Sequence, residues 1–373
     1  MVVKAGRIGY LKNFFNKIDP YISNVVFSVI LRKPRSYPSM IRLAKSYLTA
    51  RSIREKHLIE GIKVPPVLIM GVTSSCNLSC SGCYAAATGT LSMENTSKML
   101  KLYDWKKIID EATKLGVFGF IIAGGEPFLV PKILSICSTF KDRIFAFFTN
   151  GTVLKSKDIE KLKKVHNAVV MVSVEGDQVL TNDRRGRGVY EKAINTLALL
   201  KKNKVVSGIS ITINKLNYKY WMEEKNLNLL VANGIKLVFF LEYVPINQDT
   251  ELMLAQNERK SFRDKILEYR RTKNILILHS PGDEELKGGC VSAGRSFAYI
   301  TPKGDLTPCP VSNIATHNLM MSSLKNGLKS SLFTLIREQD YLLETGNSPC
   351  ALFSHQKEVQ EIVKKVNGYY TCL

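Results

Sequence analysis

The chain has 373 residues, of which 45% are hydrophobic, so it can bury a core without disulfides or other staples. Lysine and arginine (53) outnumber aspartate and glutamate (32), which gives a formal net charge of +21 and favours an anionic partner. The longest uncharged apolar stretch near the N-terminus, residues 21–31, is too short to span a bilayer and lacks a cleavage-site pattern. We therefore expect a cytoplasmic protein whose eight cysteines stay reduced.

Residues 1–65 are predicted to form a basic helical extension. Apolar residues recur at helical spacing in two stripes, which are Tyr10, Leu11, Phe14, Phe15 and Ile18, and Met40, Leu43, Ala44, Tyr47 and Leu48. Basic amphipathic helices of this kind are suited to lying on an anionic membrane surface. The alternative is that they pack on the rest of the protein and leave a solvated lysine face.

Three cysteines follow the next apolar run, residues 67–72, in the sequence CNLSCSGC. Cys76, Cys80 and Cys83 lie close enough along one loop to hold three irons of a cubane cluster and leave the fourth iron without a protein ligand. The alternative is a zinc site. Zinc normally closes with four ligands, however, and no further cysteine or histidine lies nearby in the sequence.

Six apolar, β-rich runs alternate with lysine-rich amphipathic segments between residues 67 and 245. The runs are VLIMGVT, VFGFIIAGG, IFAFFTNG, AVVMVSVEG, GISITIN and LVFFLEYVP. This alternation predicts right-handed βαβ units, a parallel sheet and helices outside it. Parallel barrels carry their chemistry at the carboxyl ends of the strands, so residues at these ends are the candidates for a site.

Short motifs stand at these strand ends. Residues 124–127 read GGEP, where glycines permit close backbone approach and a carboxylate can accept hydrogen bonds from an ammonium group. Residues 149–152 read TNGT, for which a simple turn and a substrate-side role are both open. The fourth run ends in SVEG and leads into TNDRRGRGVY, and the fifth and sixth end near Asn214 and Tyr243. For these last two residues a cap, a core partner and a ligand are all open.

Together, CxxxCxxC, GGEP, SVEG and RGRG at successive strand ends resemble the radical SAM superfamily. The resemblance implies an α/β fold with a partial (β/α)6 TIM-type barrel. It also implies a 4Fe–4S cluster that binds S-adenosylmethionine at its open iron and cleaves it reductively to a 5′-deoxyadenosyl radical, which takes hydrogen from an unactivated carbon. An electron carrier or a zinc-stabilised binding protein would not explain this coincidence of motifs.

The resemblance also assigns residues. It makes Cys76, Cys80 and Cys83 the catalytic cluster ligands, and its residues for the S-adenosylmethionine pocket are Tyr84, Gly124, Gly125, Glu126, Pro127, Ser173, Glu175, Arg185, Asn214 and Tyr243. Among these, Glu126 is implied to hold the methionine amine, Arg185 the carboxylate and Ser173 the ribose. Arg184 is a neighbouring candidate for the carboxylate. Residues 181–182 are Thr-Asn, where relatives often have His-Asp, so roles that depend on that pair are not carried over.

A second set of cysteines lies in the last hundred residues. Cys290, Gly304 and Cys309 form a C-x13-G-x4-C pattern, and AYITP with the turn at residues 303–305 predicts a hairpin that brings the two cysteines together. The pattern resembles SPASM and twitch modules, which bind an auxiliary iron–sulfur cluster, here with Cys350 and Cys372 as further ligands. Structural thiols or zinc are the alternative readings. Cys137, alone on a helix-like segment, is expected in the core.

We thus expect three units: the basic extension (residues 1–65), the barrel (66–280) and the auxiliary-cluster module (281–373). A ferredoxin or flavodoxin is the expected electron donor. Three substrate classes remain open, of which a membrane lipid ranks first because of the basic extension. A peptide would explain the SPASM-like tail, although the extension lacks the strand-rich pattern of a winged-helix leader-binding domain. A tRNA would explain the charge, but nucleic acid ranks last because no RNA-binding module is recognisable.

Overall fold

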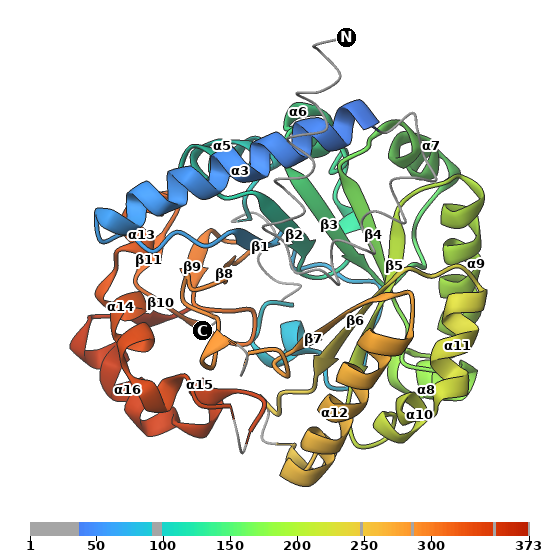
Figure 1. The fold of residues 1–373 in the computed structure, drawn as a ribbon. Helices are drawn as coiled ribbons and strands as arrows, with labels where there is room; N and C mark the ends of the chain where they lie inside the picture. Colours follow the sequence, from blue (N-terminus) through green and yellow to red (C-terminus); the bar gives the residue numbers. More distant parts are fainter. Residues whose placement is uncertain (1–36, 92–98, 247–248, 285–286, 346–347, 372–373) are drawn as a thin grey trace.

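The computed structural model describes residues 37–91, 99–246, 249–284, 287–345 and 348–371. Seven consecutive strands form its centre: β1 (Val67–Gly71), β2 (Gly119–Ala123), β3 (Ile144–Thr149), β4 (Ala168–Ser173), β5 (Ser207–Ile213), β6 (Leu237–Glu242) and β7 (Leu276–Ser280). Each pairs in parallel with the next along the chain. The first six coincide with the six predicted runs, and the predicted partial barrel is confirmed (Figure 1).

Helices follow the strands and cover the outside of the curved sheet (Figure 1). They are α4 (Tyr84–Ala87), α5 (Leu102–Lys114), α6 (Ser135–Thr139), α7 (Ser156–Lys164), α8 (Gln178–Arg185), α9 (Val189–Lys202), α10 (Tyr218–Met222), α11 (Glu224–Ala232) and α12 (Gln256–Thr272), with short 3-10 helices η3 (Pro127–Leu129) and η4 (Thr250–Leu252). The buried stripe of α5, which includes Trp105 and Ile109, faces the sheet. Exposed lysines of α7 lie on its opposite side, as expected of amphipathic helices.

The core between sheet and helices is apolar. Alternate residues of β3 are buried, and the rings of Phe120 and Phe145 stack with a centroid distance of 5.3 Å. Cys137 on α6 is fully buried in this layer, which confirms its predicted place in the core. The period-two pattern of the strands thus directs one face toward the helices, as the sequence predicted.

The C-terminal segment extends the same sheet beyond β1. Strands β8 (Phe297–Ile300) and β9 (Asp305–Thr307) form the predicted hairpin, and β11 (His317–Asn318) pairs with β9. Unexpectedly, β8 pairs in parallel with β1, so the sheet order is β11-β9-β8-β1-β2-β3-β4-β5-β6-β7. Around it lie a small sheet of β10 (Ile314–Ala315) and β12 (Tyr369–Tyr370) and helices α13 (Leu324–Leu328), α14 (Ser331–Glu338), η6 (Asp340–Leu342), α15 (Ala351–Ser354) and α16 (Gln356–Lys365).

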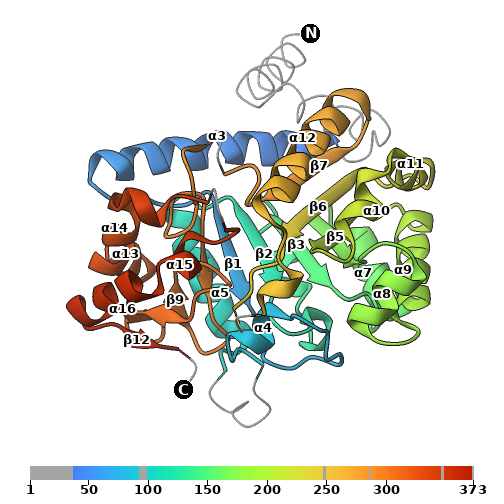
Figure 2. The ribbon, with the colours of Figure 1, turned by 90° about the horizontal axis from the view of Figure 1, so that it is seen from below.

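Helix α3 (Tyr37–Ile59) lies across the amino ends of the barrel strands, opposite α4 and the loop that precedes it (Figure 2). Its Ala44 and Ala50 are buried, and the Tyr47 ring meets Phe118, just before β2, with a centroid distance of 5.3 Å. Arg54 donates to the Gly116 carbonyl. The described part of the second apolar stripe thus packs on the barrel, which is the alternative to membrane contact. The first stripe lies outside the described residues.

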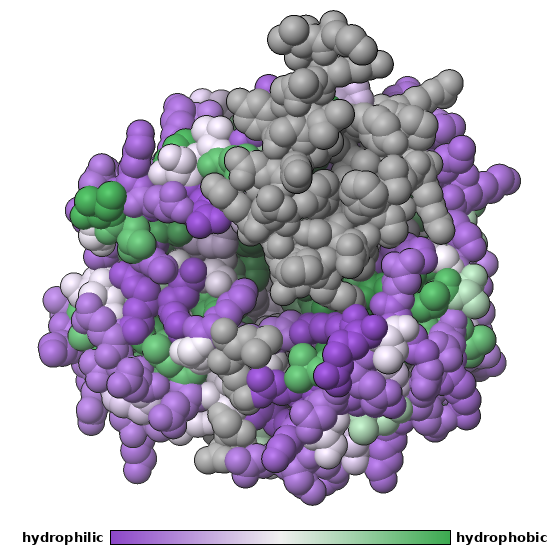
Figure 3. All heavy atoms as spheres, viewed as in Figure 1, coloured by the Kyte–Doolittle hydropathy of each residue, from purple (hydrophilic) through white to green (hydrophobic). Residues whose placement is uncertain are grey.

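Hydrophilic side chains dominate the rim of the face shown in Figure 3, with apolar residues scattered among them. This surface agrees with the large excess of lysine and arginine in the composition. Within the part of the chain that the structure describes, no helix combines the length and hydropathy needed to cross a membrane.

Candidate functional site

The three-cysteine loop connects the carboxyl end of β1 to α4. Cys76, Cys80 and Cys83 are half-buried free thiols, and Cys83 is the N-cap residue of α4. Burial raises the pKa of Cys76. Burial also raises the pKa of Cys80, against the lowering effect of Arg185 and Arg184. The positive charge beside Cys80 would stabilise its thiolate, the form that binds metal.

The GGEP turn lies directly against this loop. The Gly125 amide donates to the Thr73 carbonyl at 2.8 Å, and the Glu126 amide donates to the Ser75 carbonyl at 2.9 Å. A Cβ atom on Gly124 would lie 2.6 Å from the Thr73 carbonyl oxygen, and one on Gly125 would lie 2.0 Å from that of Ser75. Both positions therefore require glycine for close backbone approach. Tyr84 on α4 adds a hydrogen bond with the Gly124 backbone, and its pKa is raised by burial.

The Glu126 carboxylate is buried and is held by the end of β3. Its Oε1 accepts hydrogen bonds from Thr149 Oγ1 (2.8 Å) and the Phe128 amide (3.1 Å), and its Oε2 accepts one from the Asn150 amide (2.8 Å). Burial raises the pKa of Glu126, and these hydrogen bonds oppose the rise. The TNGT motif therefore has a role beyond a simple turn, because its residues Thr149 and Asn150 position Glu126. The sequence of the motif alone did not reveal this role.

The same motif fastens the three-cysteine loop. Asn150 Nδ2 donates to Asn77 Oδ1 at 2.9 Å, and Asn77 Nδ2 donates to Thr152 Oγ1 at 2.8 Å. Asn150 Oδ1 in turn accepts from the Thr152 amide and hydroxyl. Because Asn77 follows Cys76 directly, these bonds tie one end of the cysteine loop to the carboxyl end of β3.

Glu175, after β4, pairs with both arginines at the end of α8. Its Oε1 lies 2.7 Å from Arg184 Nη1, 2.7 Å from Arg185 Nε and 2.6 Å from Arg185 Nη2. Its Oε2 accepts from the Thr212 amide at 3.0 Å. Burial alone would raise the pKa of Glu175, but the charges of Arg184 and Arg185 outweigh burial and hold the pKa below its usual value.

Beyond Glu175, the side chains of Arg184 and Arg185 face different groups. Arg184 Nη2 donates to the Gly82 carbonyl at 3.3 Å, and the Ser81 amide donates to the Arg184 carbonyl at 2.9 Å. Arg184 therefore holds the second end of the cysteine loop. The Nη1 of Arg185 instead lies 4.0 Å from Cys80 Sγ, so this guanidinium faces the thiols.

Four other predicted residues have structural roles. Ser173 Oγ lies 3.1 Å from Ser210 Oγ on β5, and the Asn214 side chain accepts from the Leu216 and Asn217 amides, as a turn cap does. The Tyr243 ring packs on the cysteine loop, since a Cβ on Gly82 would lie 2.7 Å from its Cε2 atom. Pro127 is buried and begins η3. Cofactor roles for these four residues stay predictions.

The second cysteine set comes together in the C-terminal module. Cys290, Cys309 and Cys350 are buried free thiols, near enough to influence one another's ionisation. Burial raises the pKa of Cys290 to about 12 and that of Cys350 to about 11. Cys372, the fourth predicted ligand, lies outside the described residues. Glu284, which sequence reasoning missed, is buried beside the Cys290 thiol, and burial raises the pKa of Glu284 to about 7.

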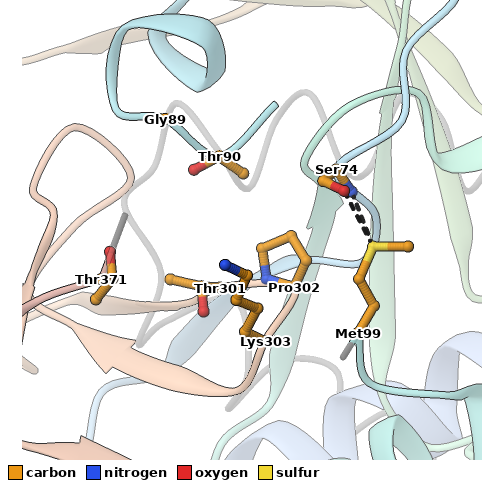
Figure 4. A pocket seen from close by; sticks show the side chains of 8 residues that line it. All are labelled: Ser74, Gly89, Thr90, Met99, Thr301, Pro302, Lys303 and Thr371. Carbon is orange, nitrogen blue, oxygen red and sulfur yellow. Dashed lines mark hydrogen bonds between the residues drawn. The ribbon is translucent and has the colours of Figure 1, made fainter. Parts of the chain in front are cut away.

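The barrel and the C-terminal module also meet at a small pocket beside the cysteine loop (Figure 4). It is lined by Ser74 and Met99 from the barrel and by Thr301, Pro302, Lys303 and Thr371 from the module, together with Gly89 and Thr90. Ser74 Oγ lies 3.1 Å from Met99 Sδ. Because β8 runs parallel to β1, both units present their carboxyl-end loops on the same side of the sheet.

The residues present fit a thiolate-bound cluster and a small zwitterionic cofactor. Soft thiolates are the donors that iron–sulfur clusters require, and the glycine cradle admits close backbone contact with a ligand. Glu126 and Arg185 supply opposite charges beside Cys76 and Cys80, respectively. Among the described side chains, no three metal-binding groups converge tightly enough for a single metal ion.

The fold and these residues define an iron–sulfur protein of the parallel α/β-barrel class. Residues 70–227 match the Radical SAM superfamily, so the chain contains a radical SAM domain. Enzymes of this family use a 4Fe–4S cluster and S-adenosylmethionine and need an electron donor.

Similar proteins differ in their substrates. The chain is 26% identical over 282 residues to the AdoMet-dependent heme synthase of Methanosarcina barkeri, covering 68% of this chain and 78% of that protein. It is 24% identical over 275 residues to the PqqA peptide cyclase of Granulibacter bethesdensis, covering 68% of this chain and 70% of that one. The solved structure of Streptococcus suis SuiB bound to precursor peptide SuiA aligns with a TM-score of 0.63 at 18% identity, over 81% of this chain and 72% of SuiB, which shows a shared fold.

Proposed function

We propose that this enzyme holds its 4Fe–4S cluster through Cys76, Cys80 and Cys83 and abstracts hydrogen from a carbon atom of a peptide. The observation that supports the cluster assignment is that hydrogen bonds hold the cysteine loop at both of its ends. Asn150 binds Asn77 at one end of the loop, and Arg184 binds Gly82 at the other. The thiols are thereby fixed beside Glu126 and Arg185 at the carboxyl ends of the strands.

The charged residues of this site have distinct tasks. Glu126 Oε2 accepts one described hydrogen bond, from Asn150, so it retains acceptor capacity for the methionine amine. Arg185 binds Glu175 through Nε and Nη2, which leaves Nη1 to face a carboxylate beside Cys80. Both terminal nitrogens of Arg184 are taken by Glu175 and Gly82, so Arg185 is the better carboxylate partner. When bound, the cluster and S-adenosylmethionine supply the one-electron chemistry.

Two observations support a peptide over a lipid. One relative is a peptide cyclase by name, and the fold is shared with an enzyme solved with its precursor peptide. The lipid prediction depended on the N-terminal apolar stripes, and the described part of the second stripe packs on the barrel through Ala44 and Tyr47. The similarity to a heme synthase makes a tetrapyrrole the competing substrate in any test.

The test is substrate-stimulated formation of 5′-deoxyadenosine by the anaerobically reconstituted, reduced enzyme. A peptide fraction, a lipid extract and iron coproporphyrin III are supplied separately. We expect the peptide fraction to stimulate the reaction and a prior protease treatment of that fraction to abolish the effect. Stimulation by the lipid extract or the porphyrin alone would contradict the peptide assignment.

The cluster assignment has its own control in the same assay. The variant Cys76→Ala/Cys80→Ala/Cys83→Ala should form no 5′-deoxyadenosine with any fraction. The matched variant Cys137→Ala, which removes a buried core thiol distant in sequence from both cysteine sets, should keep the activity. If the triple variant still cleaved S-adenosylmethionine, the central site would be wrong.

A further inference from the structure

We propose that the carboxylate of Glu284 is the fourth ligand of the auxiliary cluster, together with Cys290, Cys309 and Cys350. This inference goes beyond the proposed function and rests on the sequence prediction of an auxiliary iron–sulfur cluster in the C-terminal module. It replaces the prediction that Cys372 completes the set.

Three segments distant in the sequence converge on the thiols. The Cys290 amide donates to the Leu343 carbonyl at 2.7 Å, which joins the start of the module to the segment before Cys350. The Ala293 amide donates to the Pro308 carbonyl at 3.0 Å, which brings the residue beside Cys309 to the same place. All three thiols are at most 9% exposed. The backbone thus brings three buried thiols from three segments together.

Glu284 is brought beside these thiols by its own backbone. After β7, its carbonyl oxygen accepts from the amides of Lys287 (2.8 Å) and Gly289 (2.9 Å), so the chain turns back before it reaches Cys290. A Cβ on Gly289 would lie 2.2 Å from the Leu343 carbonyl oxygen, which shows how tightly this turn is packed. Glu284 is 6% exposed, and its carboxyl group lies close enough to Cys290, Cys309 and Cys350 to influence their ionisation, while the Cys290 thiol donates to Ser292 Oγ at 3.2 Å.

The neighbouring carboxylates form ion pairs, whereas Glu284 forms none among the described residues, although the charges of Arg295 and Lys287 act on it from beyond ion-pair distance. Asp283 pairs with Arg270 at 2.7 Å, and Glu242 pairs with Arg259 at 2.6 Å. Within the described ranges no lysine, arginine or histidine forms an ion pair with Glu284. A buried carboxylate without an ion-pair partner is costly, and coordination to iron would supply a positive charge in direct contact.

The donor set of three sulfurs and one oxygen follows from these contacts. Three thiolates leave one iron of a cubane cluster without a cysteine ligand, and the carboxylate beside Cys290 can take that position. Each ligand loses its proton when it coordinates. The oxygen donor would make one iron chemically different from the other three.

Mössbauer spectroscopy tests this in protein with Glu284 intact. The Cys76→Ala/Cys80→Ala/Cys83→Ala variant isolates the auxiliary cluster, so its spectrum is not mixed with that of the first. With ⁵⁷Fe we expect one iron site with a distinct isomer shift because of its oxygen ligand. Four sites of uniform thiolate character would overturn the proposal.

Substitution in the same background gives the second readout. Glu284→Gln should reduce the iron content from about four to about three per protein and give a 3Fe–4S signal in electron paramagnetic resonance. Glu284→Asp should retain more iron than Glu284→Gln, and Cys372→Ser should keep all of it. The proposal would be overturned if only Cys372→Ser lost one iron. It would also be overturned if neither Glu284→Gln nor Cys372→Ser lost any iron. If Cys290→Ala removes no iron, these thiols hold no cluster and the proposal fails. The proposed function is judged separately, by formation of 5′-deoxyadenosine at the first site.

Discussion

At the scale of single residues, Arg184 and Arg185 show how two adjacent like charges acquire different tasks. Both share Glu175 Oε1, which offsets their mutual repulsion in a buried setting. Their remaining nitrogens point to different groups: those of Arg184 to the backbone of the cysteine loop, and those of Arg185 to Cys80. The first is a positioning residue for the loop, and the second is a candidate contact for cofactor.

Substitution of each arginine should therefore give a different defect. Arg185→Ala should preserve iron content and weaken S-adenosylmethionine binding by roughly 10- to 100-fold, because it removes a charge-assisted hydrogen bond of about 1.5–3 kcal/mol. Arg184→Ala should lower the iron content of the reconstituted protein, because the loop loses its bond at Gly82. Iron analysis and equilibrium binding measure the two effects. The opposite pattern would show that Arg184 holds the carboxylate.

The sequence indicated the types of residue at the site but not all of their partners. The glycines of GGEP and the three cysteines could be predicted because their chemistry is local. The hydrogen bonds of Glu126 with Thr149 and Asn150 could not, because they join residues 23 and 24 positions apart on neighbouring strands. Glu284 gave no signal because its only distinction is burial beside thiols that come from three segments.

At the scale of elements, a buried ionic group joins β6, α12 and the C-terminal module. Arg259 on α12 binds Glu242 at the end of β6 through Nε (2.6 Å) and the Thr345 carbonyl through Nη1 (2.6 Å). His279 Nε2 on β7 lies 3.0 Å from the other oxygen of Glu242. One guanidinium thus links the last barrel strands to the module that carries Cys350.

Arg259→Ala should destabilise the protein by about 3–5 kcal/mol, because it leaves the buried Glu242 carboxylate without its arginine partner. Arg271→Ala, on an exposed position of the same helix, is the matched control and should change stability by no more than about 0.5 kcal/mol. Urea unfolding measures both. Equal, small effects would show that the group contributes little.

The pH dependence of this difference follows from Glu242. Burial alone would raise the pKa of Glu242, but His279 and Arg259 outweigh burial and lower it. A carboxyl group whose folded pKa is depressed contributes stability above its unfolded pKa of about 4.3, and this contribution is lost as the pH falls through the folded value. The stability advantage of wild type over Arg259→Ala should therefore shrink as unfolding is measured at progressively lower pH.

Elements were easier to predict from the sequence than their pairing. Six barrel strands were predicted because each is an apolar, β-rich run between amphipathic helices. Strand β7 was not counted, although Leu276–Ser280 continues the sheet beyond β6. The parallel pairing of β8 with β1 joins residues 67–70 to residues 297–300, and no local pattern encodes a contact over such a separation.

At the scale of the whole molecule, the two ends of the barrel have different partners. The carboxyl ends carry the thiols and the charged residues around them, whereas α3 covers the amino ends (Figure 2). Arg143, just before β3, donates to Ser46 on α3, and Arg42 on α3 donates to the Lys141 carbonyl at 3.2 Å. The basic residues of this helix thus bind loops of the barrel as well as facing solvent.

Two adjacent substitutions on α3 separate packing from membrane contact. Ala50 is fully buried, and its carbonyl oxygen would lie 2.6 Å from a Cβ on Gly116, whereas Thr49 is exposed. Ala50→Asp buries an unpaired charge and should cost about 3 kcal/mol or more of unfolding free energy, while Thr49→Asp should stay within about 0.5 kcal/mol. Thermal and urea unfolding measure this pair. Co-sedimentation with anionic vesicles tests the membrane alternative. If Ala50→Asp left stability unchanged but abolished vesicle binding, this face of α3 would be a membrane surface. The lipid would then again be the first-ranked substrate.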